Sequence, residues 1–452
     1  MGYAGWASTK VGRLRWSGAS RPRTIVAIVS VGLFLAASGI AAAAPTAKTT
    51  LVGEGFDGGT ANDASFLPSL SADGRYLSFT SAASNLVPDD TNGKLDVFVH
   101  DRQTGTTSRV SVRSDGGQAN GRSSGSSISA NGRYVAYYSH ATNLVPGDTN
   151  ETYDVFVYDR QTGTTTRVSV RSSGKQANRR SEEPAISADG RYVAFDSKAN
   201  NLVRGDTNHA GDAFVHDRRT GTTSRVSVPT RGRQANDASG VPSISADGRY
   251  VAFVSSASNL VRGDTNEEAD AFVHDRRSGR TSRVSVNSRG SQGHGPTESA
   301  SISANGRYIA FYSKAGNLVR NDINHNFDAF VYDRRTGRTG RVSVSSNESQ
   351  VIRKSRDPSI SRDGRYVAFF SLASNLVRGD TNRAWDVFVR DRQAGTTRRV
   401  SVSSNGAQGN DGSVSSSMSA NGNYVAFSSY ASNLVANDTN DRDDLFVRGP
   451  LH

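Results

Sequence analysis

The sequence after residue 44 consists of one 58-residue unit that recurs seven times without insertion or deletion. The pattern Ser-x-(Asp/Asn)-Gly has its serine at positions 71, 129, 187, 245, 303, 361 and 419, and Asn-Leu-Val begins at 85, 143, 201, 259, 317, 375 and 433. A fixed period of this length is typical of repeat architectures, in which each unit buries its apolar surface against its neighbours.

Each repeat contains four short segments with the composition of strands. In the second repeat the predicted strands cover residues 127–129, 133–138, 154–158 and 167–170. Asn131-Gly132 predicts a two-residue hairpin turn with positive φ at both residues, and Thr162-Gly163 predicts a second tight turn. Because no stretch shows a sustained helical period, we predict an all-β protein built from four-stranded units.

The two ends of the chain predict a closed ring. Four-stranded units repeated radially form a β-propeller. The last repeat stops after its third strand, because its fourth would fall near residue 457, beyond His452. Leu51 and Val52 lie one period before Arg109 and Val110, in the position of a fourth strand. We therefore predict a seven-bladed β-propeller over residues 44–452, in which residues 50–54 complete the last blade. An open solenoid would leave that blade with an unpaired edge.

The first 44 residues have the features of a targeting segment. Residues 1–23 contain five basic side chains and no acid, whereas residues 24–44 are uncharged and end in an alanine run. This pattern predicts a secretory signal peptide over residues 1–43, cleaved after Ala43. The alternative is an uncleaved membrane anchor, because 21 uncharged residues can span a bilayer. Both alternatives predict a secreted or otherwise extracytoplasmic propeller.

Composition excludes several classes of protein. The absence of cysteine rules out a disulfide scaffold, a thiolate metal site and a thiol nucleophile. Loss of residues 1–43 removes five of 54 basic residues and none of 42 acids, so the net charge falls from +12 to 49 − 42 = +7. Since these charges form no run and no aromatic–basic platform, we expect no nucleic-acid partner. We expect Arg102, Arg160 and Arg218 to pair with the aspartates beside them.

The repeat also has a family resemblance. The segments Ser-Ala-Asp-Gly-Arg-Tyr-Val-Ala-Phe (187–195), Asp-Ala-Phe-Val-His-Asp-Arg (212–218) and Thr-Gly (220–221) resemble the TolB-like β-propeller repeat. The similarity covers nearly all of the chain after residue 44. TolB itself has six blades and an additional N-terminal α/β domain, so the resemblance implies this class of propeller repeat and no particular activity.

The loop between the second and third predicted strands carries the candidate metal ligands. It contains Asp-x-Asn-x-x-x-Asp in every repeat, and oxygen ligands at alternating positions suit calcium. The alternative is that these side chains bond their own backbone as Asx-turns. Weak calcium binding is the one cofactor that we predict. The candidate ligands are Asp90, Asn92, Asp96, Asp148, Asn150, Asp154, Asp206, Asn208, Asp212, Asp264, Asn266, Asp270, Asp322, Asn324, Asp328, Asp380, Asn382, Asp386, Asp438, Asn440 and Asp444.

Antiparallel strands place this loop and the equally long interblade loop on the same face of the ring. A glutamine recurs in the interblade loops, for example Gln118 and Gln176; it is suited either to polar ligand binding or to bonding irregular backbone. Positions that break the repeat are candidates for a unique site. They are Glu182, Glu183, His294, Ile323, His325 and Asn326. His100, His216 and His274 share one strand position, which we expect to be solvated.

Two functions fit this pattern. The first is a non-enzymatic interaction or scaffold propeller, monomeric, that binds a protein or a cell-envelope polymer on its loop-rich face. Its support is the uniformity of the repeats, because catalysis needs a unique constellation of residues. The second is a polysaccharide-acting lyase or glycoside hydrolase with a site at the centre of the same face. No residue is assigned a catalytic role at this point.

Overall fold

The computed structural model describes residues 47–56, 58–232, 234–436 and 438–452. The predicted signal peptide or anchor, residues 1–43, lies outside these ranges. Among the described residues, no helix has the length and hydrophobicity that a membrane span requires.

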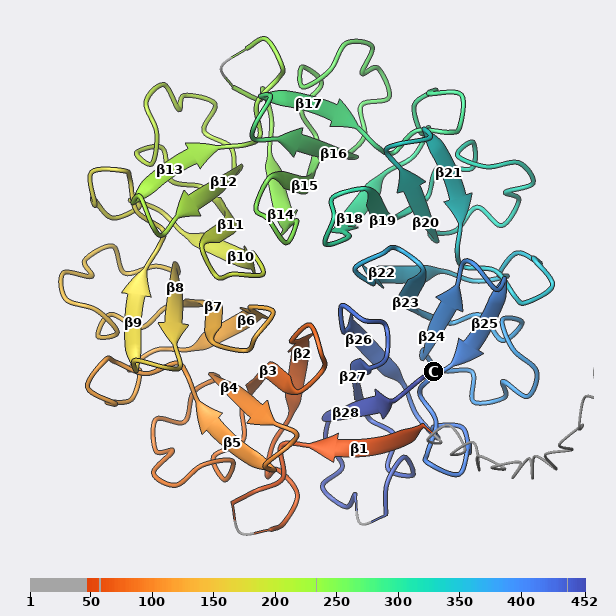
Figure 1. Ribbon diagram of the computed structural model, residues 1–452, viewed down its shortest axis with the longest axis horizontal. Coiled ribbons are helices and arrows are strands. Elements are labelled where there is room, and N and C mark those ends of the chain that lie inside the picture. Colours follow the sequence, from red (N-terminus) through yellow and green to blue (C-terminus); the bar gives the residue numbers. More distant parts are fainter. Residues whose placement is uncertain (1–46, 57, 233, 437) are drawn as a thin grey trace, which may run out of the picture. The chain divides into compact units, whose positions relative to one another are not determined.

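The described chain forms seven four-stranded antiparallel sheets arranged as blades around an axis (Figure 1). The strands nearest the axis are β2 (Ser65–Leu70), β6 (Ser123–Ile128), β10 (Ser181–Ile186), β14 (Ser239–Ile244), β18 (Thr297–Ile302), β22 (Ser355–Ile360) and β26 (Ser413–Met418). The second strands are β3 (Tyr76–Ser81), β7 (Tyr134–Ser139), β11 (Tyr192–Ser197), β15 (Tyr250–Ser255), β19 (Tyr308–Ser313), β23 (Tyr366–Ser371) and β27 (Val425–Ser429).

The third strands are β4 (Asp96–Asp101), β8 (Asp154–Asp159), β12 (Asp212–Asp217), β16 (Asp270–Asp275), β20 (Asp328–Asp333), β24 (Asp386–Asp391) and β28 (Asp444–Gly449). The outermost strands are β5 (Thr106–Arg109), β9 (Thr164–Arg167), β13 (Thr222–Arg225), β17 (Arg280–Arg283), β21 (Arg338–Arg341), β25 (Thr396–Arg399) and β1 (Lys48–Val52). We number the blades from blade 1 (β2–β5) to blade 7 (β26–β28 with β1).

Blade 7 is built from both ends of the described chain, as the sequence predicted. β1 pairs antiparallel with β28, from Lys48 opposite Gly449 to Val52 opposite Leu445. Figure 1 shows this first strand beside the last, at the outer edge of blade 7. The seven-bladed ring is therefore confirmed, and its closing strand lies two residues earlier than the predicted 50–54.

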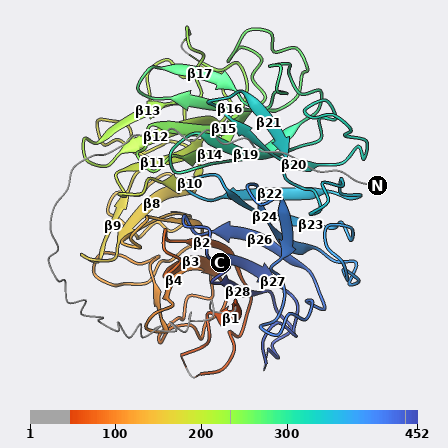
Figure 2. The ribbon, with the colours of Figure 1, turned by 45° about the vertical axis from the view of Figure 1, so that its right-hand side comes forward.

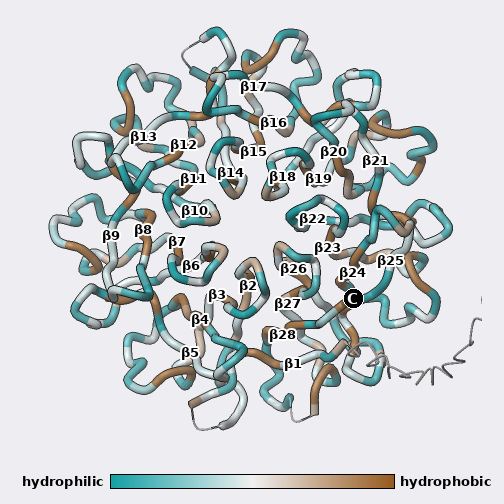
Figure 3. Tube along the Cα trace, viewed as in Figure 1, coloured by the Kyte–Doolittle hydropathy of each residue, from teal (hydrophilic) through white to brown (hydrophobic). Residues whose placement is uncertain are grey.

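The hydrophobic core lies between neighbouring blades. Val97 and Val99 of blade 1, for example, pack with Ile128, Tyr137 and Phe156 of blade 2 in one buried cluster. The strand alternation thus fills both faces of each sheet, which one blade alone could not bury. Figure 3 shows hydrophobic segments in every blade, separated by hydrophilic loops.

The glycine of the Ser-x-(Asp/Asn)-Gly turn permits close contact between blades. Gly132 has a φ of 73°, and a Cβ there would lie 2.1 Å from the ring of Tyr76 in the preceding blade. The Arg160 guanidinium lies 4.5 Å from the same ring centroid. The expected pairing of Arg160 with the adjacent aspartate is wrong, because Asp159 accepts instead from Arg133 at 2.7 Å. In blades 1 to 6 the arginine after the third strand therefore joins two blades by a cation–π contact.

Two local predictions are corrected. Only Gly132 has positive φ in the turn, and its N–H donates to Ser129 O, so the turn is not of the type that needs positive φ at both residues. The outermost strand ends at Arg167 rather than continuing over 167–170. It ends there because the Ser169 hydroxyl bonds the Val155 N–H and the Asp154 carboxylate, which interrupts the backbone ladder.

Candidate functional site

The long loops of adjacent blades are joined by hydrogen bonds on one face of the ring. Figure 2 shows the ring from an oblique angle. The Asn120 N–H donates to Asn143 Oδ1, and the Asn143 amide donates back to Gln118 O. The Gln118 amide donates to Asp89 O. These contacts favour the second interpretation of the repeated glutamines, that they bond irregular backbone.

Within the candidate metal loop, the acidic side chains are bonded to other side chains of the same blade. In blade 2, the Gln176 amide donates to Asp148 Oδ1 at 2.7 Å and to Asp154 Oδ2 at 2.8 Å. The Arg167 guanidinium lies 3.4 Å from Asp148 and 3.5 Å from Asp154. The side-chain oxygen Oδ1 of Asn150 accepts a hydrogen bond from the Thr152 N–H, as in an Asx-turn. Burial raises the pKa of Asp154, and its hydrogen bonds from Ser169 and Gln176 oppose that shift.

The ion pairs of this arrangement recur in blades 1 to 6. In each, the arginine at the end of the outermost strand forms ion pairs with both aspartates; these residues are Arg109, Arg167, Arg225, Arg283, Arg341 and Arg399. No group of three or more His, Asp or Glu side chains close enough to hold a metal occurs among the described residues. The loops therefore have the geometry of Asx-turns with internal charge compensation, and calcium binding stays a prediction.

Departures from the repeat concentrate at a second place, which we call the inner rim. It comprises the loop-side ends of the first and second strands of each blade and the residue before each third strand. At the penultimate position of the second strand the side chains are Thr80, Tyr138, Asp196, Val254, Tyr312, Phe370 and Ser428. Before the third strand they are Leu95, Tyr153, Gly211, Ala269, Phe327, Trp385 and Asp443. The next residue is invariant in both places, serine in the first and aspartate in the second.

Backbone hydrogen bonds place these positions side by side across the blade boundaries. The Ser181 N–H of β10 donates to Tyr153 O of blade 2, and the Ser355 N–H of β22 donates to Phe327 O of blade 5. The residue before each third strand therefore lies beside the first strand of the next blade. Sequence reasoning missed these residues, although a comparison of the seven copies position by position would have found them.

The inner rim of blade 3 holds a cluster of three acidic side chains. Glu182 lies directly opposite Asp196 in the β10–β11 pair, and Glu183 has a φ of 50° where the register shifts. Burial, followed by the charges of Glu183 and Glu182, raises the pKa of Asp196 to about 7. Asp196 Oδ1 is buried and has no hydrogen-bond partner within the described ranges of the chain. Like charges in opposed positions are destabilising, so this cluster is not explained by folding.

Aromatic rings flank this cluster and recur on the opposite part of the rim. In blade 2, Tyr138 and Tyr153 meet edge to face with ring centroids 5.4 Å apart. In blade 5, the Tyr312 hydroxyl donates to Glu298 at 2.9 Å. Phe370 and Trp385 of blade 6 meet at 5.0 Å. Tyr312 and Phe370 are themselves buried, whereas the rings that remain half-buried are Tyr138, Tyr153, Phe327 and Trp385. The inner rim thus combines half-buried rings with carboxylates, a composition suited to sugar recognition.

The remaining symmetry-breaking candidates lie elsewhere. His294 and His325 line one pocket of about 380 Å³ together with Glu268 and Lys314. Ile323 is 77% exposed on the surface. The structure therefore places the two histidines in one pocket. Glu182 and Glu183 lie at a different place, on the inner rim.

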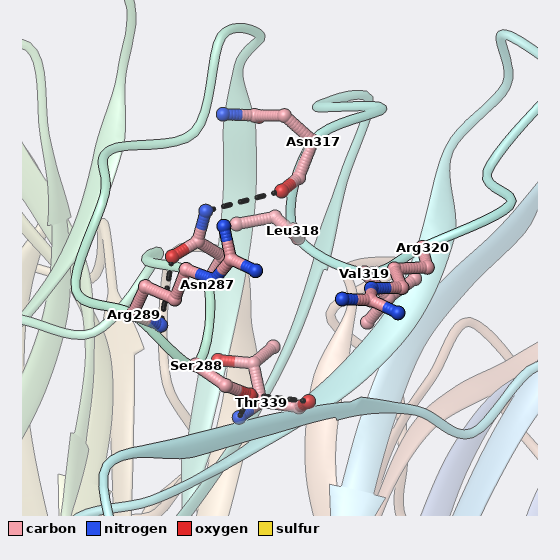
Figure 4. A pocket seen from close by; sticks show the side chains of 8 residues that line it. All are labelled: Asn287, Ser288, Arg289, Asn317, Leu318, Val319, Arg320 and Thr339. Carbon is pink, nitrogen blue, oxygen red and sulfur yellow. Dashed lines mark hydrogen bonds between the residues drawn. The ribbon is translucent and has the colours of Figure 1, made fainter.

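Other hollows repeat with the blades. The pocket in Figure 4 is lined by Asn287, Ser288, Asn317 and Thr339, and the Thr339 N–H donates to the Ser288 hydroxyl. Equivalent positions line pockets at two other blade boundaries, so this hollow is a feature of the fold.

The central opening on the tight-turn side is lined by the same two positions of all seven blades. Its lining residues are Leu70, Ala72, Ile128, Ala130, Ile186, Ala188, Ile244, Ala246, Ile302, Ala304, Ile360, Arg362, Met418 and Ala420. Arg362 is the charged side chain of this set, and the lining contains no carboxylate that could work with it in catalysis.

The shared histidine position is buried, contrary to expectation. His216 and His274 are each 6% exposed, and His216 Nδ1 lies 2.9 Å from the Thr223 hydroxyl. Burial lowers the pKa of both histidines to about 4. Both imidazoles lie at the boundary with the preceding blade and not in solvent, because the hydroxyls of Thr223 and Thr281 beside them bond Val170 O and Val228 O. His216 and His274 are therefore neutral in the folded protein at neutral pH.

Acid is therefore expected to destabilise the protein through these two histidines. The unfolded chain binds protons near pH 6.5 and the folded chain near pH 4, so stability falls as the pH drops across this window. Each histidine contributes about 3 kcal/mol at most. Blades 2 and 5 carry tyrosine here, so a His216→Tyr/His274→Tyr variant should lose less stability between pH 6.5 and 4. Urea unfolding at both pH values measures this, and equal losses would contradict it.

Comparisons with known proteins bear on the fold. A scan against protein-family models gives no match, and a search of curated proteins gives none. A solved oligogalacturonate lyase in complex with manganese matches 90% of this chain and 96% of its own, with 12% identity and a TM-score of 0.54. The oligogalacturonate lyase from Vibrio parahaemolyticus matches 90% and 97%, with 11% identity and a TM-score of 0.51. At these identities the similarity shows the fold alone.

A putative TolB from Agrobacterium tumefaciens also matches, over 66% of this chain and 88% of its own, with 14% identity and a TM-score of 0.39. The described ring of four-stranded blades has the architecture of a TolB-like propeller repeat protein, as the sequence predicted. A TM-score at this level carries no argument about activity.

Proposed function

We propose that the protein is an extracytoplasmic, non-enzymatic propeller that binds a carbohydrate-containing cell-envelope polymer along its inner rim. The observation that carries this proposal is the concentration of repeat-breaking residues there. Folding of seven nearly identical units does not require the rim residues to differ between blades. The positions directly after them, Ser81 and Asp96 in blade 1, are serine and aspartate in all seven repeats. Variation concentrated on one surface of a repeat protein is typical of a binding surface.

The chemistry of the rim supports a glycan rather than a nucleic acid. Ring faces stack on the apolar faces of sugars, and carboxylates accept hydrogen bonds from hydroxyl groups. Tyr153, Phe327 and Trp385 supply the rings, and Glu182 and Glu298 supply carboxylates beside two of them. These groups lie on blades 2, 3, 5 and 6, so an extended chain fits better than a single sugar.

Replacing the rim aromatics is expected to weaken polymer binding without unfolding the ring. The variants Tyr153→Ala, Phe327→Ala and Trp385→Ala should each lower affinity roughly tenfold, the effect of losing one stacked ring. Affinity electrophoresis against a panel of neutral and anionic envelope polysaccharides measures this. Phe56→Ala is the control, because Phe56 is 62% exposed and lies outside the rim. Equal affinities for all variants would contradict the proposal.

A polysaccharide-acting enzyme is the second candidate, and the acidic cluster of blade 3 favours it. A carboxyl with a pKa near neutrality beside a second carboxylate is the arrangement that general acid catalysis needs. Asp196 and Glu182 have this arrangement. Release of reducing or unsaturated ends by the wild type, lost in Asp196→Asn, would establish a lyase or hydrolase and overturn the non-enzymatic proposal.

A further inference from the structure

Blade 7 differs from the other six in the residues that surround its two loop aspartates. Its outermost strand comes from the N-terminal part of the domain, so the repeat position of Arg109 is filled by Leu51. The registers are equivalent, because Leu51 lies opposite Phe446 in blade 7 as Arg109 lies opposite Phe98 in blade 1. Blade 7 therefore lacks the guanidinium that neutralises the aspartates elsewhere.

The hydrogen-bond donors are missing from blade 7 for the same reason. In blades 1 to 6 a serine hydroxyl donates to the aspartate that begins the third strand, for example Ser169 to Asp154 at 2.5 Å. In blade 7 the equivalent position is Gly53. In blades 2 to 6 a glutamine amide donates to the loop aspartate, and Thr60 holds that position in blade 7. Because the outermost strand of blade 7 comes from the N-terminal segment, its two aspartates lack the arginine, the serine hydroxyl and the glutamine amide that other blades provide.

The consequence is a buried and uncompensated pair of carboxylates. Asp444 is 1% exposed, and its Oδ2 has no hydrogen-bond partner among the residues that the structure describes. Its Oδ1 accepts from the Asn440 amide at 3.1 Å. Asp438 is 9% exposed and lies close enough for its charge to raise the pKa of Asp444. No ion pair reaches either aspartate among the described residues, and the nearby Arg442 is directed to Asp63 at 3.7 Å.

The electrostatics of this pair agree with its geometry. Burial, opposed by the Asn440 hydrogen bond and reinforced by the charge of Asp438, raises the pKa of Asp444 to about 7. Asp441 and Asp443 add negative charge to the same loop and its strand. A buried charge without a partner destabilises the folded state unless a counter-charge or a proton compensates it.

We propose that the loop of blade 7 is a binding site for one divalent cation, calcium by preference, with Asp438 and Asp444 as its charged ligands. The cation supplies the positive charge that an arginine supplies in the other six blades. Two carboxylates with backbone carbonyls and water form an oxygen set that suits calcium better than a soft transition metal. The calcium hypothesis for seven loops is thereby narrowed to one. The inference is independent of the polymer-binding proposal.

Calorimetric titration of calcium chloride into the purified, chelator-treated full-length protein tests this. We expect one calcium ion per chain and an unfolding temperature several degrees higher with calcium than with chelator. Magnesium chloride at equal ionic strength serves as the probe of selectivity and should bind at least tenfold more weakly. The absence of binding at millimolar calcium would overturn the proposal.

Two variants locate the site. Leu51→Arg restores the residue of the other blades, so it should abolish calcium binding and raise the unfolding temperature measured in chelator. Asp444→Asn should lower the calcium affinity at least tenfold. This variant tests the same site if Leu51→Arg does not fold. Asp322→Asn in blade 5 is the matched control and should leave the stoichiometry at one.

The outcomes separate a cation from a shared proton. If Leu51→Arg raises the unfolding temperature while the wild type ignores calcium, the two carboxylates share a proton and the cation site is refuted. If both variants bind calcium as the wild type does, calcium binds elsewhere and the assignment to blade 7 is wrong.

Discussion

A protein that lacks residues 1–52, and therefore β1, is expected to unfold at least about 5 °C below a protein that lacks residues 1–43 only. β28 would lose its five-residue pairing with β1 and become an unpaired edge. Val52, 2% exposed, would be removed from the core at a cost of about 1.5–3 kcal/mol.

β1 also bonds the preceding blade. The Thr49 hydroxyl donates to Val402 O at 2.5 Å, and the Thr49 N–H donates to the Ser404 hydroxyl at 3.0 Å. Blade 2 makes the same contact with blade 1, because the Thr165 hydroxyl donates to Val112 O at 2.5 Å. Removal of β1 therefore breaks the ring at two places, inside blade 7 and between blades 6 and 7.

Thermal unfolding followed by circular dichroism, with light scattering to detect association, measures the effect. Lys48→Ala is a suitable control, because Lys48 is an exposed residue of β1 whose side chain contributes no core packing. Unfolding of the two truncated proteins at the same temperature would show that ring closure does not stabilise the domain.

The second large effect is expected from Arg167→Leu, which gives blade 2 the residue that blade 7 has naturally. Asp148 and Asp154 would then be buried without a counter-charge, because the side chain of Asp154 is 0% exposed and that of Asp148 is 2% exposed. Breaking a buried ion pair by removing one partner costs about 3–5 kcal/mol. Denaturant unfolding at neutral pH measures this loss.

Arg133, an arginine of the same blade that forms an ion pair on the tight-turn face, serves as the control for Arg167. Arg133 pairs with Asp159 at 2.7 Å, but its side chain is 34% exposed, so Arg133→Leu should cost much less than Arg167→Leu because solvent screens the remaining charge. Adding Asp148→Asn to Arg167→Leu should recover part of the loss. Equal destabilisation by the two leucine variants would show that burial of the pair is not the cause.

Most of the architecture could be predicted from the sequence because the period is constant and each strand has its own apolar pattern. The position of Leu51 one period before Arg109 was sufficient to predict the closing strand. The limits of the outermost strands were not predictable, because the side chain of Ser169 competes with the backbone ladder for the Val155 N–H.

Less of the candidate sites than of the architecture could be predicted from the sequence. The Asp-x-Asn-x-x-x-Asp pattern identified the acidic loops correctly, but the residue that neutralises them lies on another strand, 19 positions beyond the first aspartate in Asp148 and Arg167. The rim residues Tyr153 and Ser181 lie far apart in the sequence and come together only where blade 2 meets blade 3, because the Ser181 N–H donates to Tyr153 O. Spacing along one repeat carries no information about such contacts.

The repeat therefore determines the fold class, the number of blades and the identity of the strand that closes the ring, because these depend on periodic apolar positions and on the ends of the chain. The tertiary structure decides which charges are compensated and which surface varies. Those properties depend on contacts across strands and blade boundaries: an arginine faces the aspartates in six blades, and Leu51 faces them in the seventh.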